Sequence, residues 1–238
     1  MVPSTTTPES IPPAEQRLSD MAPEAELRVE KCIDKLQARL DLKQMYLKTL
    51  PSALCSTVRA WWHLKKLDLS GNELVLLPSD FCSSAGRNLE ELSLAFNAII
   101  YLPEQINAMT KLRVLRLQQN RLEELPDGIF LLRNLEELDV TSNSLREIPA
   151  GILNLQKLKK LLAARNAITH VADEAAALQC LELVDLAGNP VASAPDAIRN
   201  LHVRGRLLRD KATRRRLVRR ALDVRRAVRS AYQRQLLR

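Results

Sequence analysis

The chain has 238 residues, of which 46% are hydrophobic and 27% charged, so it can bury a core, yet no run approaches the roughly 18 uncharged apolar residues of a membrane-spanning helix. Aromatic residues make up only 3%, with six glycines and four cysteines, which argues against a glycine-rich phosphate-binding enzyme and a disulfide-stapled secreted domain. The net charge of +8 is unevenly divided, because residues 199–238 hold 15 basic and two acidic residues (+13) whereas residues 1–198 carry −5.

The N-terminal segment, residues 1–22, is rich in proline, serine and threonine. It has neither the apolar stretch of a secretory signal nor the basic bias of a mitochondrial transit peptide, so a cytoplasmic location is expected, with the nucleus or a large cytoplasmic assembly as alternatives. Because such a composition cannot build a core, we expect this segment to be disordered.

A helix is predicted next, over residues 24–40, with Pro23 at its first turn. Its apolar residues fall near helical spacing, at Leu27, Cys32, Ile33, Leu36 and Leu40. We expect this helix to cover the open end of the repeats that follow, since stacked repeats need a cap.

The middle of the chain, residues 37–195, repeats the pattern Leu-x-x-Leu-x-Leu-x-x-Asn-x-Leu-x-x-Leu-Pro. One clear copy, residues 112–126, reads LRVLRLQQNRLEELP. The copies begin at residues 37, 64, 89, 112, 135, 158 and 181, so that the spacing settles at 23 residues. Six copies carry asparagine at the ninth position, at Asn72, Asn97, Asn120, Asn143, Asn166 and Asn189. Met45 stands there in the first copy, and Ala163 and Ala194 replace core leucines.

This pattern resembles the leucine-rich repeat family, and the 23-residue unit resembles its intracellular, Ras-suppressor-like class. The resemblance implies an α/β solenoid, a horseshoe of about seven repeats with an N-terminal capping helix. Leucines at positions four and six alternate with polar residues, which predicts one short strand per copy, stacked into a parallel concave sheet. The asparagine amides should satisfy backbone groups of neighbouring coils. We therefore divide the chain into a segment 1–22, a repeat domain 23–205 and a tail 206–238.

Two longer connections precede the regular spacing, at residues 52–63 and 79–88, and should lie on the convex side. The first contains Trp61 and Trp62. We expect one of them to pack under the convex segment, and the other is a candidate anchor for a partner.

The tail, residues 206–238, contains neither proline nor glycine. Its apolar residues alternate three and four apart, at Leu217, Ala221, Val224, Val228 and Ala231, which predicts one long basic amphipathic helix. Its candidate contact residues are Arg214, Arg215, Arg216, Arg219, Arg220, Arg225, Arg226 and Arg229. Four acidic partners compete: RNA phosphates, an acidic protein such as tubulin, an anionic membrane surface, and the chain's own concave face.

No catalytic constellation is present in the sequence. The three histidines, His63, His170 and His202, stand in no metalloprotease motif, and there is no Walker, GxSxG or kinase signature. The cysteines are scattered at Cys32, Cys55, Cys82 and Cys180, which we interpret as small buried thiols in a reducing compartment. We expect no enzyme activity, no cofactor and no metal.

The concave face is the first candidate for function, because the family resemblance implies that it binds protein. Residues flanking the buried middle of each strand should point outward, giving an acidic and polar surface. The candidate protein-binding residues are Asp68, Glu91, Ser93, Phe96, Arg116, Gln118, Arg121, Glu137, Asp139, Lys160, Leu162 and Asp185. Phe96 is the best single anchor, with packing between coils as its alternative, and a solvated face of alternating charges is the alternative for the whole set.

These features favour a non-enzymatic adaptor that binds a protein on its concave face and docks through its basic helix to an acidic partner. A structural subunit of a ribonucleoprotein, such as a ribosome-associated protein, or of a cytoskeletal assembly is the second hypothesis. A regulatory subunit in a phosphatase or small-GTPase pathway is the third, implied by the family resemblance alone. The sequence does not fix an oligomeric state.

Overall fold

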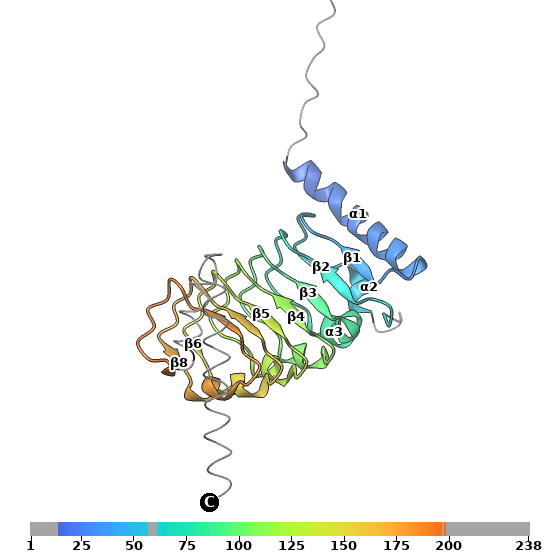
Figure 1. Cartoon of the computed structure of the whole chain (residues 1–238). Coiled ribbons are helices and arrows are strands. Elements are labelled where there is room, and N and C mark those ends of the chain that lie inside the picture. Colours follow the sequence, from blue (N-terminus) through green and yellow to red (C-terminus); the bar gives the residue numbers. More distant parts are fainter. Residues whose placement is uncertain (1–13, 57–60, 197, 199–238) are drawn as a thin grey trace, which may run out of the picture.

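The computed structural model describes residues 14–56, 61–196 and 198, with backbone alone for residues 14–22. Short coils stack side by side into a solenoid, with strands on one side and short helices on the other (Figure 1). The predicted helix over 206–238 and its arginines lie outside the described residues.

One strand from each copy of the repeat enters a seven-stranded parallel sheet. The strands are β1 (Arg39–Asp41), β2 (Lys66–Asp68), β3 (Glu91–Ser93), β4 (Val114–Arg116), β5 (Glu137–Asp139), β7 (Lys160–Leu162) and β9 (Leu183–Asp185). Equivalent positions pair directly, so Leu92 lies opposite Leu67 and Leu115. A separate parallel pair is formed by β6 (Glu147–Ile148) and β8 (His170–Val171). The stacked parallel strands predicted from the leucine spacing are therefore confirmed.

Short helices form the opposite side of the coils, and most begin immediately after the proline that closes the repeat pattern. Pro51, Pro78, Pro103, Pro126 and Pro149 precede α2 (Ser52–Cys55), α3 (Ser79–Ser83), η2 (Glu104–Ala108), η3 (Asp127–Leu131) and η4 (Ala150–Asn154). The helix η1 (Ala85–Asn88) lies in the longer second connection, and η5 (Asp173–Ala177) follows Ala172. Proline fixes its own φ and cannot extend a ladder, so the chain leaves the extended segment there.

The core runs along the solenoid as columns of leucines, each contributed by the same position of successive copies. In the third copy the residues at positions four and six, Leu92 and Leu94, are both fully buried. The alanine that replaces a core leucine at residue 163 is also fully buried. Because every column continues from coil to coil, a single repeat could not bury its own apolar face.

The asparagines bridge neighbouring coils as predicted. Oδ1 of Asn143 accepts the backbone N–H of Leu122 in the preceding coil (3.0 Å), and its Nδ2 donates to the carbonyl oxygens of Leu117 (2.9 Å) and Val140 (3.0 Å). The same three contacts recur at the other five asparagines. In the first copy, where Met45 replaces asparagine, the backbone N–H of Met45 instead donates to Asn72 (3.0 Å).

The first helix differs from its prediction at both ends. It is α1 (Ala14–Asp34), with Pro23 inside it, and Leu40 is the buried middle of β1 because the first repeat starts there. Residues 14–22 are rich in good helix formers, which extends the helix upstream of the proline. The backbone of residues 14–22 is therefore helical, and residues 1–13 lie outside the described part of the chain.

The apolar stripe of α1 also differs from the predicted one. Ala25, Val29 and Cys32 are fully buried, whereas Leu27 and Leu36 are exposed. The helix packs against β1 at one end of the sheet (Figure 1). The buried residues lie four and three positions apart, so they share one face of the helix. Leu27 and Leu36 lie off this face.

The two tryptophans separate as expected. Trp61 is buried and donates from Nε1 to the carbonyl oxygen of Ala53 (3.3 Å), whereas Trp62 is exposed. His63 is buried beside both rings. Both of its ring nitrogens are shielded and have no hydrogen-bond partner among the described residues, so its contacts there are those of a packing residue.

The asparagine contacts predict a large stability effect. Asn143→Ala leaves one N–H and two carbonyl groups without their partner, so we expect a loss of about 3 kcal/mol in the free energy of unfolding. Asn107→Ala is the control, because Asn107 is exposed on η2, and should cost less than about 0.5 kcal/mol. Urea denaturation followed by circular dichroism measures both, and equal midpoints would contradict the bridging role.

The cysteines predict a graded reactivity. Cys32 and Cys82 are buried and Cys55 is partly buried, but Cys180 is exposed, so the interpretation as four buried thiols is wrong for Cys180. Burial raises the pKa of Cys82 to about 12, so its thiolate is scarce at neutral pH. Iodoacetamide at pH 8 should alkylate Cys180 first and Cys82 only after unfolding, as followed by peptide mass spectrometry. Equal rates at these two thiols in the native chain would refute the burial of Cys82.

Candidate functional site

The face of the sheet that points away from the short helices carries the predicted outward residues. In each of the seven strands the middle residue is buried and its two neighbours are at least partly exposed. We call this surface the sheet face; it corresponds to the concave face of the sequence prediction. The described residues place Asp68, Ser93, Arg116, Asp139, Leu162 and Asp185 in one column across neighbouring strands.

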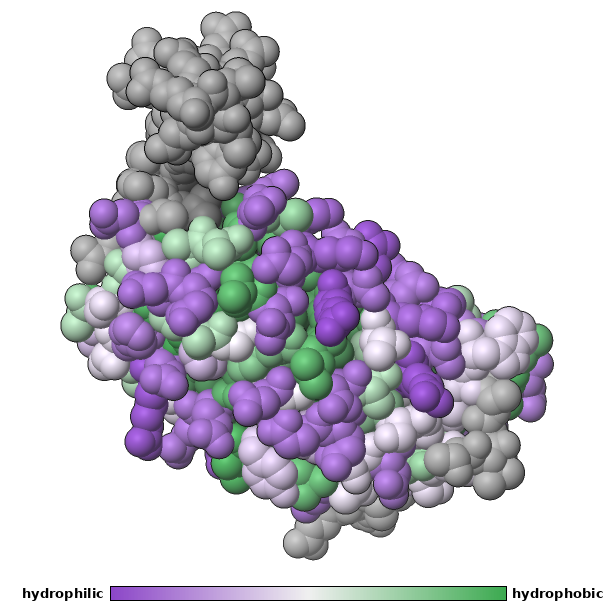
Figure 2. Space-filling model, turned by 90° about the horizontal axis from the view of Figure 1, so that it is seen from below, coloured by the Kyte–Doolittle hydropathy of each residue, from purple (hydrophilic) through white to green (hydrophobic). Residues whose placement is uncertain are grey.

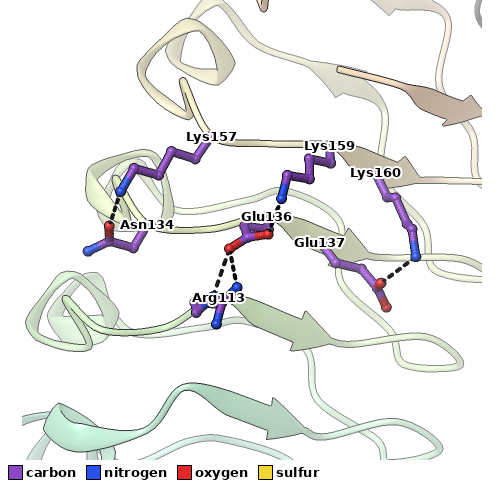
Figure 3. Close-up of polar contacts among 7 residues, drawn as sticks. All are labelled: Arg113, Asn134, Glu136, Glu137, Lys157, Lys159 and Lys160. Carbon is purple, nitrogen blue, oxygen red and sulfur yellow. Dashed lines mark hydrogen bonds and ion pairs between the residues drawn. The ribbon is translucent and has the colours of Figure 1, made fainter. Parts of the chain in front are cut away.

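Opposite charges alternate from strand to strand just before the strands begin. Glu136 lies between Arg113 (2.7 Å) and Lys159 (2.5 Å) (Figure 3). Lys65 and Glu90 repeat the arrangement nearer the N-terminus, at 3.4 Å. The two cations lower the pKa of Glu136 to about 2, chiefly through hydrogen bonds from Arg113 and Lys159.

A second row of ion pairs lies within the strands themselves. Glu137 accepts from Arg116 (3.2 Å) and Lys160 (3.1 Å), and Lys66 pairs with Glu91 (2.5 Å). The sequence marks these residues, Lys66 apart, as candidate contacts for a partner, and in the structure they also form ion pairs with one another. Exposed pairs of this kind contribute little to stability, but they leave this part of the sheet face with little net charge.

The aspartates of the outward column have a local role. Oδ1 of Asp68, Asp139 and Asp185 accepts the backbone N–H two residues further on, each at 3.0 Å. This contact fixes the side chain beside its own turn. Among the described residues Asp139 forms no ion pair. Its carboxylate therefore keeps an acceptor oxygen for another group.

A hollow of about 500 Å³ opens on the sheet face toward its C-terminal end. Asp139, Leu162 and Asp185 lie side by side in it, in direct register on β5, β7 and β9. The small side chains of Ala164 and Ala187 also line it. Phe96 stands at one side with 57% of its surface exposed, so its alternative role in packing between coils is wrong.

Position eight of the repeat supplies lining residues that the sequence prediction missed. Gln119, Ser142, Arg165 and Gly188 line the hollow, and all have positive φ, as has Phe96. A side chain there leaves the turn in a left-handed conformation, which glycine adopts most easily. The available signal was glycine at this position in two copies, Gly71 and Gly188.

Two of the predicted protein-binding residues, Arg121 and Gln118, differ from the others in their position relative to the hollow. Arg121 is exposed one residue beyond Asn120 and does not line the hollow. Gln118 lines it, and its side-chain oxygen is shielded from solvent without accepting a hydrogen bond from the described residues. An acceptor in this state costs free energy until a donor reaches it.

A second apolar surface lies beyond the asparagines of the second and third copies. Val75, Leu76, Ile100 and Tyr101 are each close to half exposed, and Leu76 forms a parallel bridge with Tyr101. The side of the molecule seen in Figure 2 shows small, separated apolar areas. In the described part of the chain there is no cluster of His, Cys, Asp and Glu able to hold a metal and no helix able to span a membrane.

Two family models match the chain, one described as leucine rich repeat over residues 62–122 and one as leucine-rich repeat region over residues 100–207. The repeat domain therefore belongs to the leucine-rich repeat family. Proteins of this family generally mediate protein–protein interaction and are typically not enzymes. No curated protein matches the chain by sequence.

Solved structures share the fold. A leucine-rich repeat protein of Leptospira interrogans is 34% identical, with a TM-score of 0.60 over 73% of this chain and 49% of that one. An internalin from Listeria monocytogenes is 20% identical (TM-score 0.57, 76% and 47%), and the PEPR1–AtPEP1 structure is 24% identical (TM-score 0.53, 62% and 21%). The chain spans about half or less of these proteins, and the last two show the fold alone.

The Glu136 cluster predicts a pH-dependent contribution to stability. Because the folded pKa of about 2 lies below the ordinary 4.5, the contribution is complete above about pH 4.5 and is lost as the pH falls through 2. Glu136→Gln should therefore lower the free energy of unfolding at pH 7 and make little difference at pH 2. Guanidinium titrations at several pH values measure this difference. Glu147→Gln is the control, because Glu147 is exposed and forms no ion pair among the described residues, and a pH-independent effect of Glu136→Gln would contradict the model.

Proposed function

We propose that the chain is a non-enzymatic adaptor that binds a protein partner on its sheet face. The observation that carries this proposal is the hollow beside Phe96, where an exposed aromatic ring, the Leu162 side chain and fixed polar groups meet. Aromatic residues in such surroundings are common anchors of protein interfaces. The family's general role in protein–protein interaction supports the same function.

We also propose the class of leucine-rich repeat, the cellular compartment of the protein and a docking role for residues 206–238. The 23-residue spacing supports the intracellular, Ras-suppressor-like class. Four cysteines without a disulfide support a reducing compartment such as the cytoplasm. The arginines of residues 206–238 support docking to an acidic partner, and the predominance of arginine over lysine suits bidentate contacts with carboxylate or phosphate.

A second candidate function rests on the same tail. A net charge of +13 over residues 199–238 would also suit a structural subunit of a ribonucleoprotein, with the arginines on RNA phosphates. Ribonuclease-sensitive co-sedimentation with ribosomes would favour this function, whereas co-sedimentation with filaments would favour a cytoskeletal assembly. A regulatory role in a phosphatase or small-GTPase pathway draws on the family resemblance alone.

Two matched aromatic substitutions test the sheet face. Phe96 and Tyr101 are both 57% exposed, but only Phe96 lines the hollow. In affinity purification with quantitative mass spectrometry, Phe96→Ala should weaken capture of the main partner roughly thirtyfold, the effect of losing a central aromatic anchor. Tyr101→Ala should leave capture unchanged. If Tyr101→Ala alone abolishes capture, the partner binds the second apolar surface and the sheet-face proposal is wrong.

A further inference from the structure

We propose that the hollow on the sheet face is a binding site for arginine side chains, and that its occupant is the chain's own segment 206–238. This inference uses the same face as the proposed function. It goes beyond that function by naming the chemistry of the ligand and its source.

The hollow offers acceptors around an apolar floor. Asp139 and Asp185 flank Leu162 in register, so that their Cα atoms are about 10 Å apart across two strand spacings. Gln118 also lines the hollow, and its side-chain oxygen accepts no hydrogen bond from the described residues. A guanidinium group is a planar set of donors with weakly hydrated faces, so it can lie over Leu162 while its edge binds carboxylate. The exposed ring of Phe96 can stack on the same group.

Two of the cations near the hollow already pair with Glu137. Arg116 lies beside Asp139 in the outward column, but its guanidinium pairs with Glu137 at 3.2 Å. Lys160 pairs with the same carboxylate at 3.1 Å. Arg165 lines the hollow and is exposed, and no ion pair joins it to Asp139. An incoming guanidinium would therefore meet Asp139 without displacing an ion pair that the described residues form.

The segment 206–238 supplies the complementary charge. It contains 12 arginines and one lysine against two aspartates, and residues 1–198 have a net charge of −5. Like charges at helical spacing repel one another, so an acidic surface that binds them stabilises the segment. This charge complementarity favours the tail over a neutral or acidic partner.

The described part of the chain ends in the coil that carries β9, one of the strands that line the hollow. Ile198, the last described residue, comes 13 residues after β9 and follows Pro195, the repeat position after which the other coils form their short helices. Residues 199–205 can span up to roughly 25 Å when extended. The hollow reaches from the turn after β3 to β9, which is about 19 Å across four strand spacings. A tether of this length gives an effective concentration of about millimolar, so weak individual contacts suffice.

The two parts of the molecule would then regulate each other. While the arginines of the tail occupy the hollow, a partner cannot reach Phe96. An acidic partner that binds the tail would free the sheet face. The full chain should therefore capture a sheet-face partner better when the eight arginines of the predicted contact set are replaced by glutamine.

Photo-crosslinking on the purified full chain tests the contact directly. Phe96 is replaced by the photoreactive analogue p-benzoyl-phenylalanine, which inserts into C–H bonds within reach, and the same analogue at Tyr101 is the matched control. We expect adducts to peptides of residues 206–238 from position 96 and few from position 101. An equal mixture of ¹⁵N-labelled and unlabelled chains distinguishes the sources, because adducts within one chain carry a single label. Adducts of mixed label would identify a second copy as the occupant and overturn the proposal.

Charge substitutions complete the experiment. Asp139→Asn retains the oxygen that accepts the N–H of Thr141, so the turn should persist while the charge is lost. Together with Asp185→Asn it should lower the adduct yield at position 96 about tenfold. Asp68→Asn is the control, because Asp68 makes the same local contact with Ser70 outside the hollow. Equal yields in the double variant and in Asp68→Asn, or no tail adduct at position 96, would overturn the inference. The comparison of Phe96→Ala with Tyr101→Ala would still test the proposed function separately.

Discussion

The structure depends on the pairing of backbone groups inside coils that turn sharply after each strand. Each asparagine at position nine resolves this constraint by bonding backbone groups of its own coil and of the preceding one. The turn that carries the asparagine also forces the residue before it into the left-handed region. The same local geometry that closes the coil therefore projects Phe96, Gln119, Ser142 and Arg165 to the edge of the sheet face.

Charge on the sheet face is organised by the stacking of equivalent positions. Residues 23 apart become neighbours, so a change of sign between successive copies becomes an ion pair across strands, as in the Arg113–Glu136–Lys159 cluster. Toward β9 this alternation gives way to Leu162, Ala164 and Ala187. The face thus has a paired, nearly neutral part and a hollow in which carboxylates surround an apolar floor, and these two parts suit different contacts.

Much of the fold could be predicted because the repeat signals are local and redundant. Leu92 and Leu94 define a strand by their spacing, and the asparagines define the turn. The hollow could not be predicted in the same way, since its depth depends on small side chains in adjacent coils and on the left-handed direction of Phe96. The pairing of Glu137 with both Arg116 and Lys160 could not be predicted either. Which neighbouring side chain a carboxylate contacts depends on the positions of the side chains in space. The predicted start of the first helix was wrong because Pro23, a residue that usually marks a helix start, lies inside α1.

The bridging asparagines have a direction. In every pair the oxygen of one coil's asparagine accepts an N–H from the coil before it, as Asn97 does from Leu74 and Asn120 from Ile99. Each coil therefore receives hydrogen-bond partners from the repeat that is translated after it. In the first coil, which lacks its own asparagine, the backbone N–H groups of Met45 and Leu47 donate to Asn72. During synthesis, each coil would therefore gain its last backbone partners only when the following repeat has left the ribosome.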